Sequence, residues 1–245
     1  MKIVVCGKGG SGKSTVSALL ARACVRRGMR VLVLDADESN FGLHRLLGLP
    51  RPDDFTHYFG HKKGIFADGA ADVFAPGWNL EDLPADFCAG DDDLRLMAVG
   101  KIHDAGEGCA CAMGALAKEL LEHLILREDE IAIIDTEAGV EHFGRGVDRF
   151  ADRILMVADP SYESVCLSEK ICAMGRDFGK PVSILLNKAD AAQQQMLREA
   201  IPDREAIIGA LGQSGAILSA GLRGAALEEI PPEIDAVLDA LEVRR

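Results

Sequence analysis

The chain has 245 residues, of which 48% are hydrophobic and 27% are charged, and its formal net charge is −12. This length and apolar content predict a folded domain with a sizeable core and exclude a mainly disordered chain. Lys and Arg total 27 against 39 Asp and Glu. Because an acidic protein gains nothing from counterion release on a polyanion, we do not expect nucleic-acid binding.

No apolar stretch of the sequence approaches the about 18 residues that a membrane-spanning helix needs. The N-terminus begins with a strand-like segment and has no signal-peptide pattern. The seven cysteines, an odd number, suit a reducing compartment. We therefore expect a cytoplasmic protein that does not contact a membrane.

In chain order, the predicted elements alternate strands with helices. An apolar run at residues 2–6 precedes a glycine-rich turn, and apolar residues at helical spacing follow from Lys13 to Gly28. Further runs are short and apolar on both faces, as buried parallel strands are. These runs are residues 31–34, 94–99, 131–134, 154–158 and 182–186.

The remaining segments are predicted to surround this sheet. Residues 41–93 carry several prolines and acidic turns and should form loops and short helices over one sheet edge. Residues 114–126 predict an amphipathic helix, and residues 232–243 a short acidic one. Together the elements predict a single α/β domain over residues 1–245, with a doubly wound, mostly parallel sheet flanked by helices, as in P-loop NTPases.

Residues 7–14, Gly-Lys-Gly-Gly-Ser-Gly-Lys-Ser, match the phosphate-binding pattern G-x-x-x-x-G-K-[ST] between a strand and a helix. In such a loop the backbone N–H groups and the helix N-terminus converge on phosphate oxygens. We expect Lys13 to reach the β- and γ-phosphates and the Ser14 hydroxyl to bind Mg²⁺. The other predicted nucleotide contacts in this loop are Gly9, Gly10, Ser11, Gly12 and Thr15.

Lys8 places a second lysine directly after the first glycine. The resulting K-G-G-x-G-K-S form resembles the deviant Walker A motif of the ATPase group that includes nitrogenase iron protein, MinD, ParA and the arsenite-pump ATPase. The resemblance implies an ATPase that forms a homodimer, in which Lys8 reaches the nucleotide of the partner. A cation supplied in this way neutralises phosphate charge only when the dimer closes.

Polar residues follow the later strands, at the sheet edge where ligands bind in such folds. The resemblance implies that Asp37 orients water or the Mg²⁺ shell, a task that Asp35 can share, and that Asp135 is the Walker B carboxylate. Asn187 and Lys188 begin an N-K-x-D string, whose amide suits a purine and which also matches the guanine-reading motif of GTPases. The deviant Walker A form favours ATP and ADP.

Cys109 and Cys111 stand one residue apart in a glycine-rich segment before a predicted helix. Two thiolates can bind nickel or zinc but do not complete a tetrahedral site, whereas two chains related by a twofold axis supply four. From spacing alone, a pair of small buried side chains and a redox pair are also open interpretations, although a C-x-C disulfide closes a strained ring.

The phosphate loop, the segment 99–102 leading to Gly-Glu-Gly-Cys-Ala-Cys, and Asp-Thr-Glu-Ala-Gly-Val-Glu-His at 135–142 together resemble the CooC-type ATPases. These are nickel-insertion accessory proteins for carbon monoxide dehydrogenase. The resemblance implies that Cys109 and Cys111 bind Ni²⁺, or Zn²⁺ in its place, at a dimer interface, and that the apo-dehydrogenase is a partner. The resemblance does not distinguish nickel from zinc as the bound metal, and it leaves the adenine pocket after residue 205 undefined. The sequence also departs from the family pattern at Ala112, where a proline is expected.

The main alternative is a MinD- or ParA-like ATPase switch without metal delivery. Membrane binding of that kind needs a basic amphipathic C-terminal helix, whereas residues 233–242 are acidic. DNA binding needs a basic surface, which the net charge disfavours. A third class, iron–sulfur donors or scaffolds, uses widely separated cysteines or a C-x-x-C near the C-terminus, and the sequence has neither arrangement.

Overall fold

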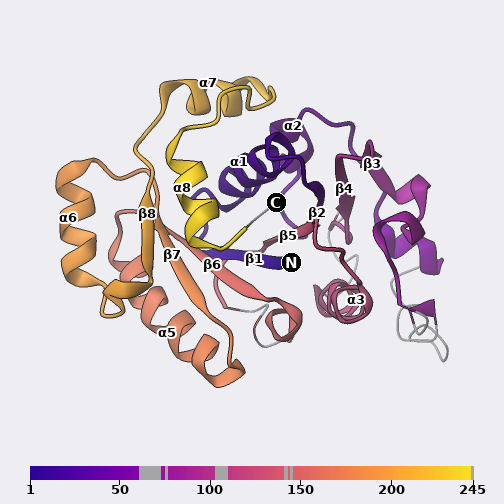
Figure 1. Ribbon diagram of the computed structural model, residues 1–245, viewed down its shortest axis with the longest axis horizontal. Helices are drawn as coiled ribbons and strands as arrows, with labels where there is room; N and C mark the ends of the chain where they lie inside the picture. Colours follow the sequence, from indigo (N-terminus) through magenta and orange to yellow (C-terminus); the bar gives the residue numbers. More distant parts are fainter. Residues whose placement is uncertain (61–72, 75–76, 103–109, 141–142, 144–145, 244–245) are drawn as a thin grey trace.

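A computed structural model describes residues 1–60, 73–74, 77–102, 110–140, 143 and 146–243, with the backbone but not the side chains of residues 110 and 111. Its strands form one eight-stranded sheet in the order β3-β4-β2-β5-β1-β6-β7-β8 (Figure 1). All neighbouring strands pair in parallel except β3 and β4. The strands are β1 (Lys2–Gly7), β2 (Arg30–Ala36), β3 (Cys88–Gly90), β4 (Leu94–Ala98), β5 (Glu130–Thr136), β6 (Arg153–Ala158), β7 (Val182–Leu186) and β8 (Ile207–Ala210).

Helices cover both faces of the sheet. Figure 1 shows α1, α2, α7 and α8 on one face, and α3 and α5 on the other. The helices are α1 (Lys13–Arg26), α2 (Leu43–Leu47), α3 (Ala110–His123), α5 (Tyr162–Phe178), α6 (Ala191–Ala200), α7 (Gly215–Arg223) and α8 (Glu233–Ala240). Within the described ranges, no helix combines the length and the apolar character needed to cross a bilayer.

The core residues alternate between the two faces along each central strand. Val5 packs in a cluster with Leu19 of α1 and Val237 of α8, whereas its neighbour Val4 packs in a cluster with Leu120 of α3. All five side chains are fully buried. This burial on both faces explains why the strands read as continuous apolar runs, and it confirms the predicted doubly wound α/β fold.

The predicted strands are confirmed with small changes at their ends, and so is the acidic C-terminal helix. In the described parts of residues 41–93 the predicted loops and short helices are present, but the segment also contains strand β3. That segment contributes α2 and short 3₁₀ helices beside the β3 edge. Two strands were not predicted, β3 and β8, because runs of three and four residues carry too little periodicity to distinguish them from loops. Both lie at the sheet edges. Helix α3 begins at Ala110, earlier than predicted.

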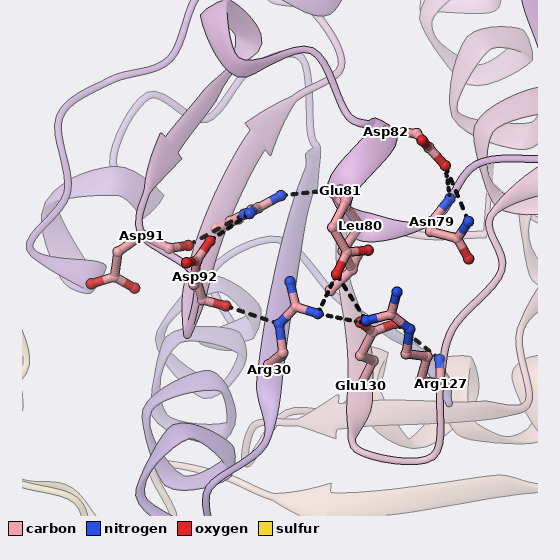
Figure 2. Close-up of polar contacts among 10 residues, drawn as sticks. Arg30, Asn79, Leu80, Glu81, Asp82, Asp91, Asp92, Arg127 and Glu130 are labelled. Atoms are coloured by element: carbon pink, nitrogen blue, oxygen red, sulfur yellow. Dashed lines mark hydrogen bonds and ion pairs between the residues drawn. The ribbon is translucent and has the colours of Figure 1, made fainter.

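An arginine–carboxylate network joins the segment containing Glu81 to the end of the sheet where β2 and β5 begin (Figure 2). Arg30 Nη1 lies 2.8 Å from Glu130 Oε1 and 2.6 Å from Glu81 Oε1, and Glu130 is fully buried. Arg127 donates its backbone N–H to Glu130 Oε2 at 2.9 Å and also pairs with Glu81. The hydrogen bond from Arg30 holds the pKa of Glu81 at about 2, so the Glu81 carboxylate stays ionised at neutral pH.

Replacing Arg30 tests whether this network stabilises the fold. Arg30→Met leaves the buried Glu130 carboxylate with Arg127 alone, and we expect it to lower the free energy of unfolding by about 3 kcal/mol, the lower end for a broken buried pair. Urea denaturation measures the change. Arg176→Met, which removes an exposed pair with Asp203, is the matched control and should cost less than about 1 kcal/mol. Equal losses of unfolding free energy in the two variants would show that the buried pair with Glu130 stabilises the fold no more than an exposed pair does.

Candidate functional site

The phosphate loop, residues 7–14, leaves the end of β1 and enters α1 through two positions that only glycine can occupy. Gly7 has a φ of +142°, and a Cβ there would lie 2.4 Å from the Val157 carbonyl oxygen of β6. Gly12 has a φ of +101°, and a Cβ there would lie 2.4 Å from Asn187 Nδ2. Any side chain at these positions would be strained and would clash. Gly7 and Gly12 are therefore required by close packing against β6 and Asn187.

The predicted Mg²⁺ and phosphate residues come together beside this loop. Lys13 is only 7% exposed, and its Nζ lies 3.5 Å from the Lys8 carbonyl oxygen. Asp135, at the end of β5, is fully buried and accepts a hydrogen bond from Ser17 Oγ at 3.0 Å. Its second oxygen, Oδ2, has no hydrogen-bond partner of ordinary geometry among the described residues, although Ser14 lies near enough to influence its pKa.

The ionised form of Asp135 is disfavoured by burial. Burial raises the pKa of the carboxyl to about 6, against the opposing effects of the Ser14 and Ser17 hydroxyls and the Lys13 ammonium. A buried carboxylate oxygen without a partner and a nearby hydroxyl are hard oxygen ligands of the type that Mg²⁺ prefers. The residues present therefore fit a Mg²⁺ ion held by Ser14 and Asp135.

The loop after β2, residues 37–40, approaches the phosphate loop from the other side. Asn40 Nδ2 donates to Ser14 Oγ at 2.6 Å, which ties this loop to the predicted Mg²⁺ hydroxyl. Asp37 is buried, and its Oδ1 accepts the backbone N–H of Ser39 at 2.9 Å. The structure thus places Asp37 near the site, with one oxygen engaged in a local turn.

Lys101 is a site residue whose role the sequence did not reveal. It follows β4, is 2% exposed, and its Nζ lies 2.7 Å from Asp35 Oδ2 while donating to the Asp37 carbonyl oxygen. Even so, burial raises the pKa of Asp35 to about 7. A lysine buried this deeply needs a paired carboxylate. One feature of the sequence could have indicated this pair. Lys101 follows a buried strand, and Asp35 lies near the end of another strand at the same edge of the sheet.

Asn187 and Lys188 contact the phosphate loop. Asn187 Nδ2 donates to the Ser11 carbonyl oxygen at 2.8 Å, and Lys188 Nζ donates to the Gly10 carbonyl oxygen at 2.7 Å. Both side chains therefore brace the loop, and a contact with the base stays a prediction. Asp190, the residue that would read guanine, accepts the Gln193 N–H at 2.9 Å and caps α6.

The predicted cysteine site lies largely outside the described residues. Cys109 is not among them, and only the backbone of Cys111 is described, in the first turn of α3. Elsewhere in the described ranges, no group of three or more His, Cys, Asp or Glu side chains has an arrangement that would hold a metal ion. The role of the two thiols therefore stays a prediction.

Comparisons with known proteins agree on one family. The CobQ/CobB/MinD/ParA nucleotide binding domain matches residues 2–227. An uncharacterized ATP-binding protein of Methanocaldococcus jannaschii is 42% identical over 250 residues, 99% of each chain. The carbon monoxide dehydrogenase accessory protein CooC of Rhodospirillum rubrum is 35% identical over 196 residues, 77% of this chain and 74% of CooC.

Solved structures show the same fold. The cell division ATPase MinD of Pyrococcus furiosus has a TM-score of 0.66 at 20% identity, covering 99% of this chain and 97% of its own. The septum site-determining protein MinD of Pyrococcus horikoshii, solved in complex with Mg-ADP, has a TM-score of 0.64 at 18% identity, covering 91% and 86%. At these identities the likeness establishes the architecture alone.

The raised pKa of Asp135 predicts a pH-dependent gain of stability in Asp135→Asn. The pKa is 3.8 in the unfolded reference and about 6 in the folded protein, so the folded state binds the proton more tightly and loses stability as pH rises between these values. Without nucleotide or Mg²⁺, the variant should be more stable than the wild type by about 3 kcal/mol above pH 6. Denaturant unfolding across pH measures this gain, which should vanish below pH 3.8.

The exposed carboxylate Asp86 provides the control for this measurement. Asp86→Asn should show no comparable gain at any pH, because an exposed carboxylate is ionised at little cost. A gain in Asp135→Asn that is the same at every pH would contradict the assignment to ionisation of the buried carboxyl.

Proposed function

The chain belongs to the CobQ/CobB/MinD/ParA nucleotide-binding family, and from that premise we propose that it is a dimeric ATPase of the CooC type. In this proposal, ATP binding and hydrolysis switch a homodimer that carries Ni²⁺ between paired cysteines and delivers it to apo-carbon monoxide dehydrogenase. The observation that carries the proposal is the 35% identity to CooC in a chain that also has the Cys109-Ala110-Cys111 segment.

The phosphate loop and its neighbours supply what ATP hydrolysis requires. In this reaction a water oxygen bonds to the γ-phosphorus as the bond to the ADP oxygen breaks, and catalysis consists mainly of positioning and charge neutralisation. Lys13 provides a buried cation at the loop, and Asp37 is the group proposed to orient the water. Mg²⁺ bound by Ser14 and Asp135 would neutralise phosphate charge.

Lys8 supports the dimeric part of the proposal. Its side chain is 32% exposed at the surface of the phosphate loop, in contrast to the buried Lys13. This partial exposure supports a role in which Lys8 reaches a second copy of the chain. A cation shared in this way makes hydrolysis conditional on dimer formation.

The segment that precedes the cysteines is hydrogen-bonded to the end of β2 and to the loop that follows it. Val99 N–H donates to the Asp35 carbonyl oxygen at 2.9 Å, and Ile102 N–H donates to the Glu38 carbonyl oxygen at 3.1 Å. Since Asn40 of that loop reaches Ser14, changes at the nucleotide have a covalent and hydrogen-bonded route toward the cysteine segment. This connection is the physical basis proposed for coupling the metal to the nucleotide.

Metal titration of the purified dimer tests the nickel proposal. We expect about one Ni²⁺ or Zn²⁺ per two chains, because four thiolates complete one tetrahedral site. Cys109→Ser and Cys111→Ser should each abolish the binding, measured by metal analysis and by thiolate-to-metal absorption under anaerobic conditions. Cys88→Ser is the matched control, because burial raises the pKa of that thiol to about 11 and disfavours the thiolate. Unchanged stoichiometry in both pair variants would favour a MinD- or ParA-like switch without metal delivery.

Lys8→Ala tests the dimeric ATPase. The variant should retain nucleotide binding within about threefold, since Lys13 remains, but lose ATP-dependent dimerisation and about 10³-fold in hydrolysis rate, the scale of a cation supplied in trans. Fluorescent-nucleotide binding, light scattering and phosphate release measure the three effects. Lys170→Ala, which removes an exposed lysine of α5, serves as a control for loss of a surface lysine. Normal hydrolysis by Lys8→Ala would exclude the trans role of Lys8.

A further inference from the structure

The ammonium of Lys8 is held by a carboxylate of its own chain. Its Nζ lies 3.1 Å from Asp159 Oδ2. The contact follows from the sheet register, in which Gly7 at the end of β1 pairs with Val157 near the end of β6. Lys8 is the first residue after β1, and Asp159 is the first residue after β6. Neither the phosphate loop motif nor the spacing of the sequence indicated this partner.

Two serine hydroxyls hold the Asp159 carboxylate in position independently of Lys8. Its Oδ1 accepts hydrogen bonds from Ser161 Oγ at 2.7 Å and from Ser164 Oγ at 2.6 Å, at the start of α5. These bonds leave Oδ2 facing Lys8. Although burial acts to raise it, the two hydroxyls and the Lys8 charge hold the pKa of Asp159 below its ordinary value, so the carboxylate is ionised at neutral pH.

We propose that Asp159 is a positioning residue that retains Lys8 within its own subunit and thereby sets the threshold for dimerisation. This inference rests on the proposed function, in which Lys8 acts on the nucleotide of a second copy. An ammonium paired with Asp159 is not available to the phosphates of the partner, so dimer closure exchanges one anionic partner for another. The ion pair therefore opposes closure until a nucleotide with sufficient negative charge is present across the interface.

The size of the effect follows from the exposure of the pair. The Lys8 and Asp159 side chains are 32% and 17% exposed, so solvent screens the attraction, and its loss should change an equilibrium by roughly two- to tenfold. The effect should shrink at high ionic strength, because salt screens a partly exposed pair.

Asp159→Asn removes the charge while keeping an oxygen that can accept from Ser161 and Ser164. With Mg²⁺ and a non-hydrolysable ATP analogue, we expect the dissociation constant of its dimer to fall roughly two- to tenfold below that of the wild type. Sedimentation or light scattering over a protein concentration series measures it. Asp159→Glu, which restores the charge, should return the constant toward the wild-type value. Asp203→Asn, which breaks the exposed pair with Arg176 far along the chain, is the matched control and should leave it unchanged.

A double-variant cycle with Lys8→Ala makes the assignment specific. If Asp159 acts through Lys8, adding Asp159→Asn to Lys8→Ala should have no further effect on dimerisation. An unchanged or weakened dimer in Asp159→Asn, or an effect that persists without Lys8, would overturn the inference. If Lys8→Ala loses dimerisation but Asp159→Asn has no effect, the positioning role of Asp159 is rejected and the proposed function is not. If Lys8→Ala dimerises normally, both the trans role of Lys8 and this inference are rejected.

Discussion

Parallel pairing of β1 with β5 on one side and β6 on the other is the constraint on which the site depends. This pairing aligns the carboxyl ends of strands that are far apart in the chain. The phosphate loop, Asp135 and Asp159 consequently meet at one edge, although more than a hundred residues separate the first from the other two. Packing is so close at this edge that Gly7 lies against a β6 carbonyl. The glycine-rich loop is thus a consequence of sheet geometry as much as of phosphate binding.

A second constraint is the concentration of negative charge at the same edge. Asp35 and Asp135 are buried, and burial raises the pKa of both. Two buried lysines offset this charge, Lys101 at Asp35 and Lys13 at Asp135. Lys101 is paired with Asp35, whereas within the described part of the chain the hydrogen bond of the Lys13 ammonium is a long one, 3.5 Å to the Lys8 carbonyl oxygen. This difference suits a structural role for Lys101 and leaves Lys13 available for phosphate. Burying these charges lowers the stability of the folded protein, a cost expected at a site that binds Mg²⁺ and phosphate together.

The two loops that face the phosphate loop differ in how they are held. The loop after β2 is bonded to Ser14 through Asn40 and to the segment after β4 through backbone hydrogen bonds. The start of α5 instead holds Asp159, which holds Lys8. A nucleotide at the phosphate loop therefore meets two independent sets of contacts, one leading toward the cysteine segment and one toward the surface where a second chain would bind. In the proposed function, these are the routes to metal and to dimer.

Local sequence patterns were sufficient for the phosphate loop, the central strands and most helices, because glycine spacing and apolar periodicity are properties of neighbouring residues. The family assignment from Lys8 and the loop was also available at that level and agrees with the comparisons. The edge strands β3 and β8, the burial of Lys101, the Lys8–Asp159 pair and the contacts of Asn187 with the loop depended on the tertiary structure. β3 and β8 are too short for periodicity to distinguish them from loops. The lysine and asparagine contacts join residues that are distant in the chain, and only strand order and register bring such residues together. The cysteine pair, which suggested the function most specifically, is known by its sequence alone.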